Sequence, residues 1–191
     1  MELDLVNDIH PLLKERKSIF AYADRSVSDD TLDRLFEAAR WAPSSFNEQP
    51  WAFLYAKKND GAVFDTLFEL IFEGNQSWAK TAPLLVLTLS KKRTDFNGQI
   101  NHSALHDVGM AESNFIFQAT HEGLYVHQMG GFDRGRAREA LDIPEKYDPI
   151  DIMAVGYPGN IDELDDDRVK KRASAARTRN PVNSFVFRGG F

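Results

Sequence analysis

The sequence contains no cysteine. This absence excludes disulfide bonds, thiolate zinc sites, cysteine-ligated iron–sulfur clusters and cysteine nucleophiles. It also excludes a thioether link to a cofactor, so that any cofactor must be held by other means. A chain without disulfides fits a reducing compartment, and we expect a cytoplasmic protein.

Long apolar runs and an excess of positive charge are also missing. The longest apolar run, Pro83 to Leu89, is too short to span a bilayer, and the acidic N-terminus lacks the apolar segment of a secretory signal. The net charge is −6 and the pI is about 5.4. These values argue against nucleic acid or a membrane as the main partner, because both favour basic surfaces. A local basic pocket for one phosphate remains compatible with them.

The chain has what a folded domain needs. With 191 residues, 42% of them hydrophobic and 14 of them phenylalanine, it can bury a sizeable aromatic core. We expect a single domain over residues 1–191, in which residues 160–191 form a C-terminal extension.

Hydrophobic periodicity predicts both helices and strands. Helices are expected over residues 5–15, 28–40, 62–72, 104–122 and 133–141, and strands over residues 51–56, 83–89, 125–129, 150–155 and 183–187. The acidic stretch 162–167 and the basic residues after it are interpreted as a solvated connector. The apolar strand at 183–187 must pair with something, and a tail that pairs with a second subunit is one solution.

The first polar cluster that could carry chemistry is Arg16-Lys17-Ser18, at the end of the first helix. Two cations and a hydroxyl on adjacent residues can bind a phosphate, since arginine offers a planar fork of donors. The alternative is an ordinary solvated helix end, where cations are favoured in any case.

The second cluster lies between a helix and a strand, in a loop held open by Pro43 and Pro50. It offers two hydroxyls and two side-chain amides, from Ser44, Ser45, Asn47 and Gln49. Such groups supply both donors and acceptors, as a heterocyclic ring edge or a ribityl chain requires. A hydrogen-bonded turn is the alternative.

The third cluster is the pair Arg177 and Arg179. In an extended segment, residues two apart point to one face, which suits a dianionic phosphate. The alternative is a basic tail with no ligand.

Two other motifs give weaker indications of function. His102 and His106 have the spacing of two metal ligands on one helix face, but no metalloprotease motif surrounds them, and we expect no metal site. The segment from Gly130 to Gly135 fits neither the dinucleotide fingerprint nor the phosphate-binding loop.

Together the clusters resemble the nitroreductase family of flavoproteins. The specific part is Ala-Pro-Ser-Ser-Phe-Asn-Glu-Gln-Pro-Trp at 42–51, with Arg-Lys-Ser before it and Arg-Thr-Arg near the end. The segments 74–76 and 123–131 match two further parts of the family pattern, so that the resemblance runs from about residue 8 to about residue 181. It implies an α+β fold with a mixed central sheet flanked by helices. It also implies an intertwined homodimer with an exchanged C-terminal tail and FMN at the subunit interface.

The resemblance also implies roles for individual residues. Arg16 and Ser18 would contact the phosphate or ribityl end of FMN with Lys17 beside them, and Arg177 and Arg179 would form the late phosphate-binding pair. The family supplies one loop of the site from the other subunit, and here that loop contains Pro43, Ser44, Ser45, Asn47 and Gln49. Asn75 would contact the edge of the flavin ring. The backbone of Gln128, Met129, Gly130 and Gly131 would lie near flavin N5 and O4.

One position departs from the family pattern. Phe20 stands where relatives often carry arginine or lysine near the pyrimidine end of the flavin. If Phe20 lies at the ring, the reduced flavin should be less stabilised and its potential lower; the alternative is that Phe20 points into the core.

The function implied is an NAD(P)H-dependent oxidoreductase that works by ping-pong hydride transfer through flavin N5. Nitro, quinone or enal compounds are the expected acceptors, and no side-chain acid or base is required. Reductive dehalogenation or flavin fragmentation on the same fold, and flavin binding without turnover, are the alternatives.

Overall fold

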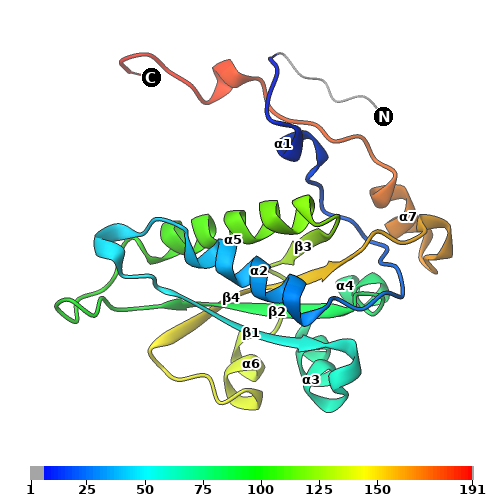
Figure 1. The fold of residues 1–191 in the computed structure, drawn as a ribbon, viewed down its shortest axis with the longest axis horizontal. Helices are drawn as coiled ribbons and strands as arrows, with labels where there is room; N and C mark the ends of the chain where they lie inside the picture. Colours follow the sequence, from blue (N-terminus) through cyan, green and yellow to red (C-terminus); the bar gives the residue numbers. More distant parts are fainter. Residues whose placement is uncertain (1–6, 191) are drawn as a thin grey trace.

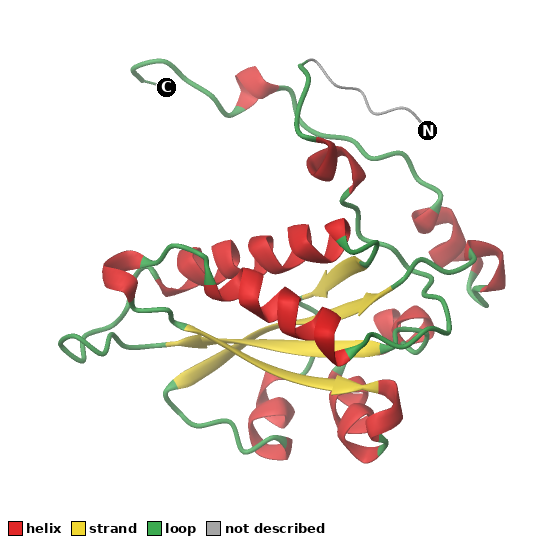
Figure 2. Ribbon diagram, in the orientation of Figure 1, coloured by secondary structure: helices red, strands yellow, loops and turns green. Residues whose placement is uncertain are grey.

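The structure is a computed structural model that describes residues 7–190. A four-stranded sheet forms its centre, with helices on both faces (Figure 1, Figure 2). The strands are β1 (Trp51–Lys57), β2 (Leu84–Lys91), β3 (Tyr125–Met129) and β4 (Tyr147–Gly156), in the spatial order β1-β2-β4-β3. The predicted α+β class is confirmed.

All three strand pairs are antiparallel, so the expected mixed sheet is not found among the described residues. Residues 183–187, predicted as a strand, contain the end of a short 3₁₀ turn at Val182–Ser184 followed by irregular chain, and they do not join the sheet of their own protomer.

Seven α-helices surround the sheet within the described residues. They are α1 (Pro11–Glu15), α2 (Asp29–Arg40), α3 (Ala62–Leu70), α4 (Glu73–Ala79), α5 (Ala104–His121), α6 (Arg134–Ala140) and α7 (Asp167–Ala173). Short 3₁₀ turns occur at Ser45–Asn47, Lys58–Asp60 and Ile161–Glu163. None of the helices in residues 7–190 is long and apolar enough to cross a membrane.

Two apolar layers hold the sheet between the helices. Helices α2 and α5 cover one face, where Leu35 and Phe115 pack against Val86, and α3, α4 and α6 lie on the other, around Trp78 and Phe132 (Figure 1). Strand β2 is buried along nearly its whole length. A strand covered on both faces reads as a continuous apolar run, which is why it was the clearest strand signal.

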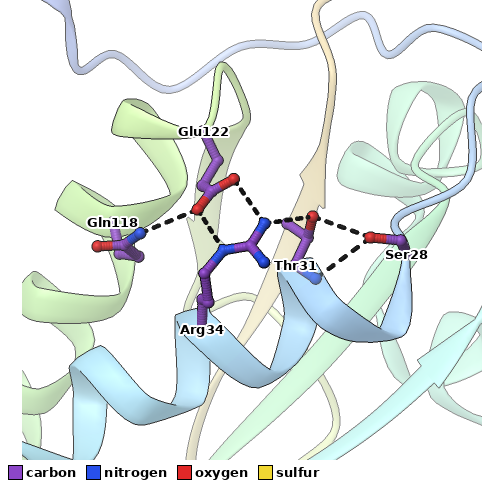
Figure 3. Close-up of polar contacts among 5 residues, drawn as sticks. All are labelled: Ser28, Thr31, Arg34, Gln118 and Glu122. Atoms are coloured by element: carbon purple, nitrogen blue, oxygen red, sulfur yellow. Dashed lines mark hydrogen bonds and ion pairs between the residues drawn. The ribbon is translucent and has the colours of Figure 1, made fainter.

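A polar cluster fastens α2 to the end of α5 (Figure 3). Arg34 donates from Nε and Nη2 to the carboxylate of Glu122, at 2.6 and 2.9 Å, and Gln118 donates to the same carboxylate at 3.0 Å. The hydroxyl of Ser28 accepts from the backbone amide of Thr31 at 3.2 Å and so caps α2, as the sequence predicts.

Helix boundaries differ from the prediction where prolines or charges decide them. Helix α1 begins at Pro11, because proline suits the first helical turn; Leu5, part of the predicted helix, lies outside the described residues. The prediction of a solvated connector after residue 162 is wrong in part. Residues 167–173 form α7, in which Asp166 caps the helix and Val169 is buried. Helix α4 was not predicted.

Candidate functional site

The residues after α1 and the tail after α7 lie against each other. Arg177 donates from Nη1 to the carbonyl oxygen of Lys14 at 2.5 Å and from Nη2 to that of Leu13 at 3.4 Å. These bonds satisfy carbonyls at the end of the short helix α1 and anchor the tail there. They bring the first and third sequence clusters, 161 residues apart at Arg16 and Arg177, to one place.

Three guanidinium groups gather at this place. Partial burial, then the charges of Arg177 and Arg179, lower the pKa of Arg16; burial and Arg179 lower that of Arg177. The Nε atom of Arg177 is buried without a hydrogen-bond partner. None of the three arginines forms an ion pair with a carboxylate in the described part of the chain. Such a cluster of cations favours an anion strongly, because an anion would relieve the mutual repulsion.

A cavity of about 500 Å³ opens beside these cations. Its walls come from the end of α1, the residues after it, the start of β3 and the end of α7, and they include Lys17, Ser18, Tyr125, Arg172 and Arg177. The ammonium group of Lys17 lies 5.5 Å from the centre of the Tyr125 ring. The cavity therefore combines positive charge, a hydroxyl and an aromatic wall, which suits a phosphorylated aromatic ligand.

A second part of the candidate site joins α4 to the end of β3. The amide of Phe72 donates to the carbonyl of Gly131 at 3.0 Å, and Ile71 forms a β-bridge with Phe132. A Cβ atom at Gly131 would lie 3.4 Å from the side-chain nitrogen of Asn75. Glycine therefore leaves the Asn75 amide in direct reach of the Gly130–Gly131 backbone.

An aromatic stack links these two parts. The ring of His127 lies 4.3 Å from that of Trp78, and the ring of Phe20 meets both edge-on, at 4.7 and 5.2 Å. The Nδ1 atom of His127 is 2.7 Å from the carbonyl oxygen of Ile19. Burial lowers the pKa of His127, so the ring is neutral at pH 7 and Nδ1 carries the proton. The stack fixes β3 against the segment that follows Ser18.

The side chain of Phe20 lies in the core, which is the alternative position that the sequence analysis kept open. The guanidinium group of Arg172, from α7, lies 4.8 Å from the centre of its ring. A cation therefore occupies the neighbourhood where Phe20 itself supplies none, and it comes from a segment that the sequence analysis treated as a connector.

The loop with the second cluster lies elsewhere in the protomer. It follows α2 on the left of Figure 1, away from α1 and from α7, which lies on the right. The amide of Ser45 donates to Asp107 at 3.0 Å, and Ser44 accepts from the amide of Gln49 at 3.1 Å. Phe46, Asn47 and Gln49 all have positive φ, an unusual run for residues other than glycine. The structure therefore does not bring Pro43, Ser44, Ser45, Asn47 and Gln49 to the cation cluster of their own chain.

The sequence analysis missed four residues of the site, namely Trp78, Tyr125, His127 and Arg172. Alternation along β3 could have indicated two of them, since Tyr125, His127 and Met129 share one face. Met129 is buried in the core and offers only its backbone, while the side chain of Gln128 points to the other face of the sheet. Arg172 carries no sequence signal, because its place follows from the fold of α7. Among residues 7–190, no three histidine, aspartate or glutamate side chains gather as metal ligands would.

Comparison with known proteins decides the family. The model of the Nitroreductase family matches residues 13–157, about three quarters of the chain. The chain belongs to the nitroreductase family.

Relatives within this family support the assignment. A protein of Archaeoglobus fulgidus, named provisionally as an NADH dehydrogenase/NAD(P)H nitroreductase, is 30% identical over 77% of this chain and 83% of its own length. The FMN reductase (NAD(P)H) of Bacillus subtilis is 26% identical over 80% of this chain and 68% of its own. A crystal structure of an oxidoreductase containing FMN is 31% identical, with a TM-score of 0.92 over 99% of this chain and 96% of that one. The nitroreductase fold is thus shared along nearly the whole chain.

Proposed function

We propose that this nitroreductase-family protein binds one FMN per protomer without a covalent link and oxidises NAD(P)H. Its acceptors are small electron-poor compounds of the nitro, quinone or enal type. The observation that carries the proposal is the cluster of Arg16, Arg177 and Arg179 beside a cavity of about 500 Å³. Three cations without carboxylate partners match a phosphate dianion, and an aromatic-lined cavity of this size can hold part of a ring system.

The residues of the chain divide the task of holding the cofactor. Arg16, Arg177 and Arg179 grip the phosphate, and Lys17 and Ser18 lie along the path to the ribityl chain. When bound, FMN supplies the two-electron chemistry. Asn75 and the backbone of residues 128–131 lie at the ring edge, where fixed donors stabilise negative charge without reorganisation.

A homodimer completes the proposed site. Within one protomer the loop with Pro43, Ser44, Ser45, Asn47 and Gln49 follows α2 and lies apart from α1 and α7 in Figure 1. A second copy of the chain brings this loop to the cofactor, and residues 160–191 embrace that copy. This arrangement would account for the run of positive φ values in the loop, since strained backbone often occurs at binding sites, and for the exposure of the tail.

One experiment tests the proposal. Heat-denatured protein should release a yellow supernatant whose flavin is FMN. The intact protein should be bleached within seconds by NADH or NADPH in the absence of oxygen, and a quinone or nitro compound should restore the colour. A colourless protein that takes up no FMN on titration would overturn the proposal. Bound FMN that neither nicotinamide bleaches would leave a flavin-binding protein without this turnover.

A further inference from the structure

Two carboxyl groups are buried together between α5 and the sheet. Glu112 of α5 and Asp151 of β4 are only 6% and 8% exposed. The side-chain amide of Gln128, on the neighbouring edge strand β3, donates one nitrogen to both, at 2.9 and 3.1 Å. Gln128 itself is exposed, so its amide forms the cover between this pair and solvent.

The pair has fewer hydrogen-bond donors than two carboxylates need. Glu112 Oε1 and Asp151 Oδ1 are buried without a partner, and so is the hydroxyl of Thr88, which lies directly opposite Asp151 on β2. Its place opposite Asp151 puts the Thr88 hydroxyl near the pair, but within the described residues it forms no hydrogen bond to either carboxyl. An ionised carboxylate accepts several hydrogen bonds, and a buried one without them is costly.

The charges around the pair do not neutralise it. Within the described part of the chain, the other groups that act on the ionisation of the pair are Thr88 from β2, Gln128 from β3 and Arg134 from α6, of which only Arg134 is charged. Arg134 favours the ionised form of Asp151, yet its guanidinium donates to the carbonyl of Ile150 and forms no ion pair with either carboxyl among the described residues. One partial countercharge can therefore support one carboxylate, not two.

Burial and the neighbouring Asp151 raise the pKa of Glu112 to about 8, and burial also raises that of Asp151. Two buried carboxylates that accept from the same Gln128 nitrogen would repel each other strongly if both were ionised, so the proton belongs to the pair. If that proton were lost, repulsion would push the two carboxylates apart and toward water. Gln128 would then lose its hydrogen bonds to them.

We propose that Glu112 and Asp151 share one proton at neutral pH, and that this proton holds Gln128 and thereby the end of β3 where it leads into Gly130 and Gly131. Both acids are positioning residues, since neither lies in the cavity beside the arginines. The effect on the flavin rests on the proposed function, because it requires the ring edge to lie along residues 128–131. The shared proton itself does not depend on any ligand.

Infrared difference spectroscopy between pH 6 and pH 10 tests whether the pair holds a proton. The wild-type protein should show the carbonyl band of a protonated carboxyl that disappears at the higher pH. Glu112→Gln should lack the band, because the new amide donates to Asp151 in place of the proton. Glu139→Gln makes the same substitution at an exposed carboxyl of α6, away from the pair, and should keep the band. A wild-type spectrum without it would overturn the proposal, and so would a band that survives in Glu112→Gln.

Unfolding against pH provides a second measurement. The unfolded glutamate has a pKa near 4.5 and the folded one near 8, so the folded state alone holds the proton between these values. The stability that this proton gives is present below about pH 4.5 and is lost as pH rises to about 8. The wild type should thus bind one more proton on folding in this window than Glu112→Gln does. Equal proton uptake in the two proteins would refute the shared proton. Asp151→Asn serves the same comparison if Glu112→Gln fails to fold.

Titration with FMN tests the positioning effect. The FMN phosphate itself ionises near pH 6, so the comparison is made between proteins at each pH. Wild-type affinity should fall relative to that of Glu112→Gln as pH rises through the ionisation of the pair. Glu139→Gln should follow the wild type. If FMN affinity changed with pH in the same way in the wild type, Glu112→Gln and Glu139→Gln, the pair would not influence the flavin site. Failure of every variant to bind FMN would instead reject the proposed function, and the infrared result would stand.

Discussion

We expect individual arginines to contribute to the binding of the proposed phosphate, but they differ in their contacts with the rest of the protein. Arg177 holds two carbonyls of α1, so its loss would also release the tail. Among residues 7–190, Arg179 donates only to the carbonyl of the neighbouring Thr178, at 2.6 Å, so we expect its removal to leave the protein framework intact. Arg179 is therefore the residue on which the phosphate assignment can be tested cleanly.

We expect Arg179→Ala to weaken FMN binding by about tenfold to a hundredfold, because a hydrogen bond to a charged group contributes about 1.5–3 kcal/mol. Titration of the apoprotein measures this change. Riboflavin lacks the phosphate and should bind the variant and the wild type alike. Arg188→Ala, a second exposed arginine of the tail, is the control for lost charge. Equal FMN affinity in Arg179→Ala and the wild type would contradict the assignment.

Phe20 takes the core position, one of the two that the sequence analysis kept open. Its position follows Arg16-Lys17-Ser18 by two residues, but its ring packs against Trp78 and His127 in the core. The lower flavin potential expected from the missing cation loses its basis, because Arg172 lies over the same ring. The contact between Phe20 and α7 is tertiary, and no local pattern encodes it.

At the scale of elements, the junction of α2 and α5 depends on one carboxylate. The hydrogen bond from Arg34 is the main cause that lowers the pKa of Glu122 below its usual value of 4.5 (Figure 3). A depressed pKa stabilises the fold above the unfolded value, and this stabilisation is lost as pH falls through the folded value.

We therefore expect Glu122→Gln to be less stable than the wild type at pH 7 and nearly equal to it at pH 3. Urea unfolding at the two pH values measures the difference. Added salt should narrow the gap at pH 7, since the pair is partly exposed. Glu139→Gln controls for the change in net charge. A gap of the same size at both pH values would show that Glu122 acts through packing instead.

The elements themselves were largely predictable from the sequence. Strand β2 and helix α5 followed from an uninterrupted apolar run and from helical spacing, and Ser28 marked the start of α2. Helix α4 was hidden, because its short sequence Glu-Gly-Asn-Gln-Ser-Trp-Ala carries little periodicity and includes a glycine. The sequence predicts the two arginine clusters as anion ligands, and this stays a prediction. Their meeting was not predictable, because it depends on the bonds from Arg177 to α1, which link residues 163 and 164 positions apart.

At the scale of the whole molecule, the tail is the least explained part of a single protomer. It runs away from the domain (Figure 1), and its apolar side chains Phe185 and Val186 are 62% and 58% exposed. Exposed apolar segments of this kind mark interaction surfaces. They support the proposed homodimer, in which the tail contacts the second copy.

Deletion of residues 182–191 should therefore cost solubility, flavin or both. Analytical ultracentrifugation should show the full-length protein as a dimer. The double variant Phe185→Ser, Val186→Ser should shift the equilibrium toward monomer, and Arg188→Ser, next to these residues, should not. Obligate interfaces bury about 2,000 Å² or more, so a partial loss of contacts should be visible at micromolar concentration. A stable, fully yellow monomer of the truncated chain would exclude this role of the tail.

The aromatic stack gives the protein an optical reporter of its own. The chain has three tryptophans, of which Trp78 is fully buried against His127 while Trp41, at the C-terminal end of α2, is 72% exposed. Fluorescence from a buried indole lies at shorter wavelength than that from an indole in water, so the two can be separated in an emission spectrum. A flavin held beside Asn75 would sit within energy-transfer range of Trp78. The short-wavelength emission would then fall as the cofactor enters and return as it leaves.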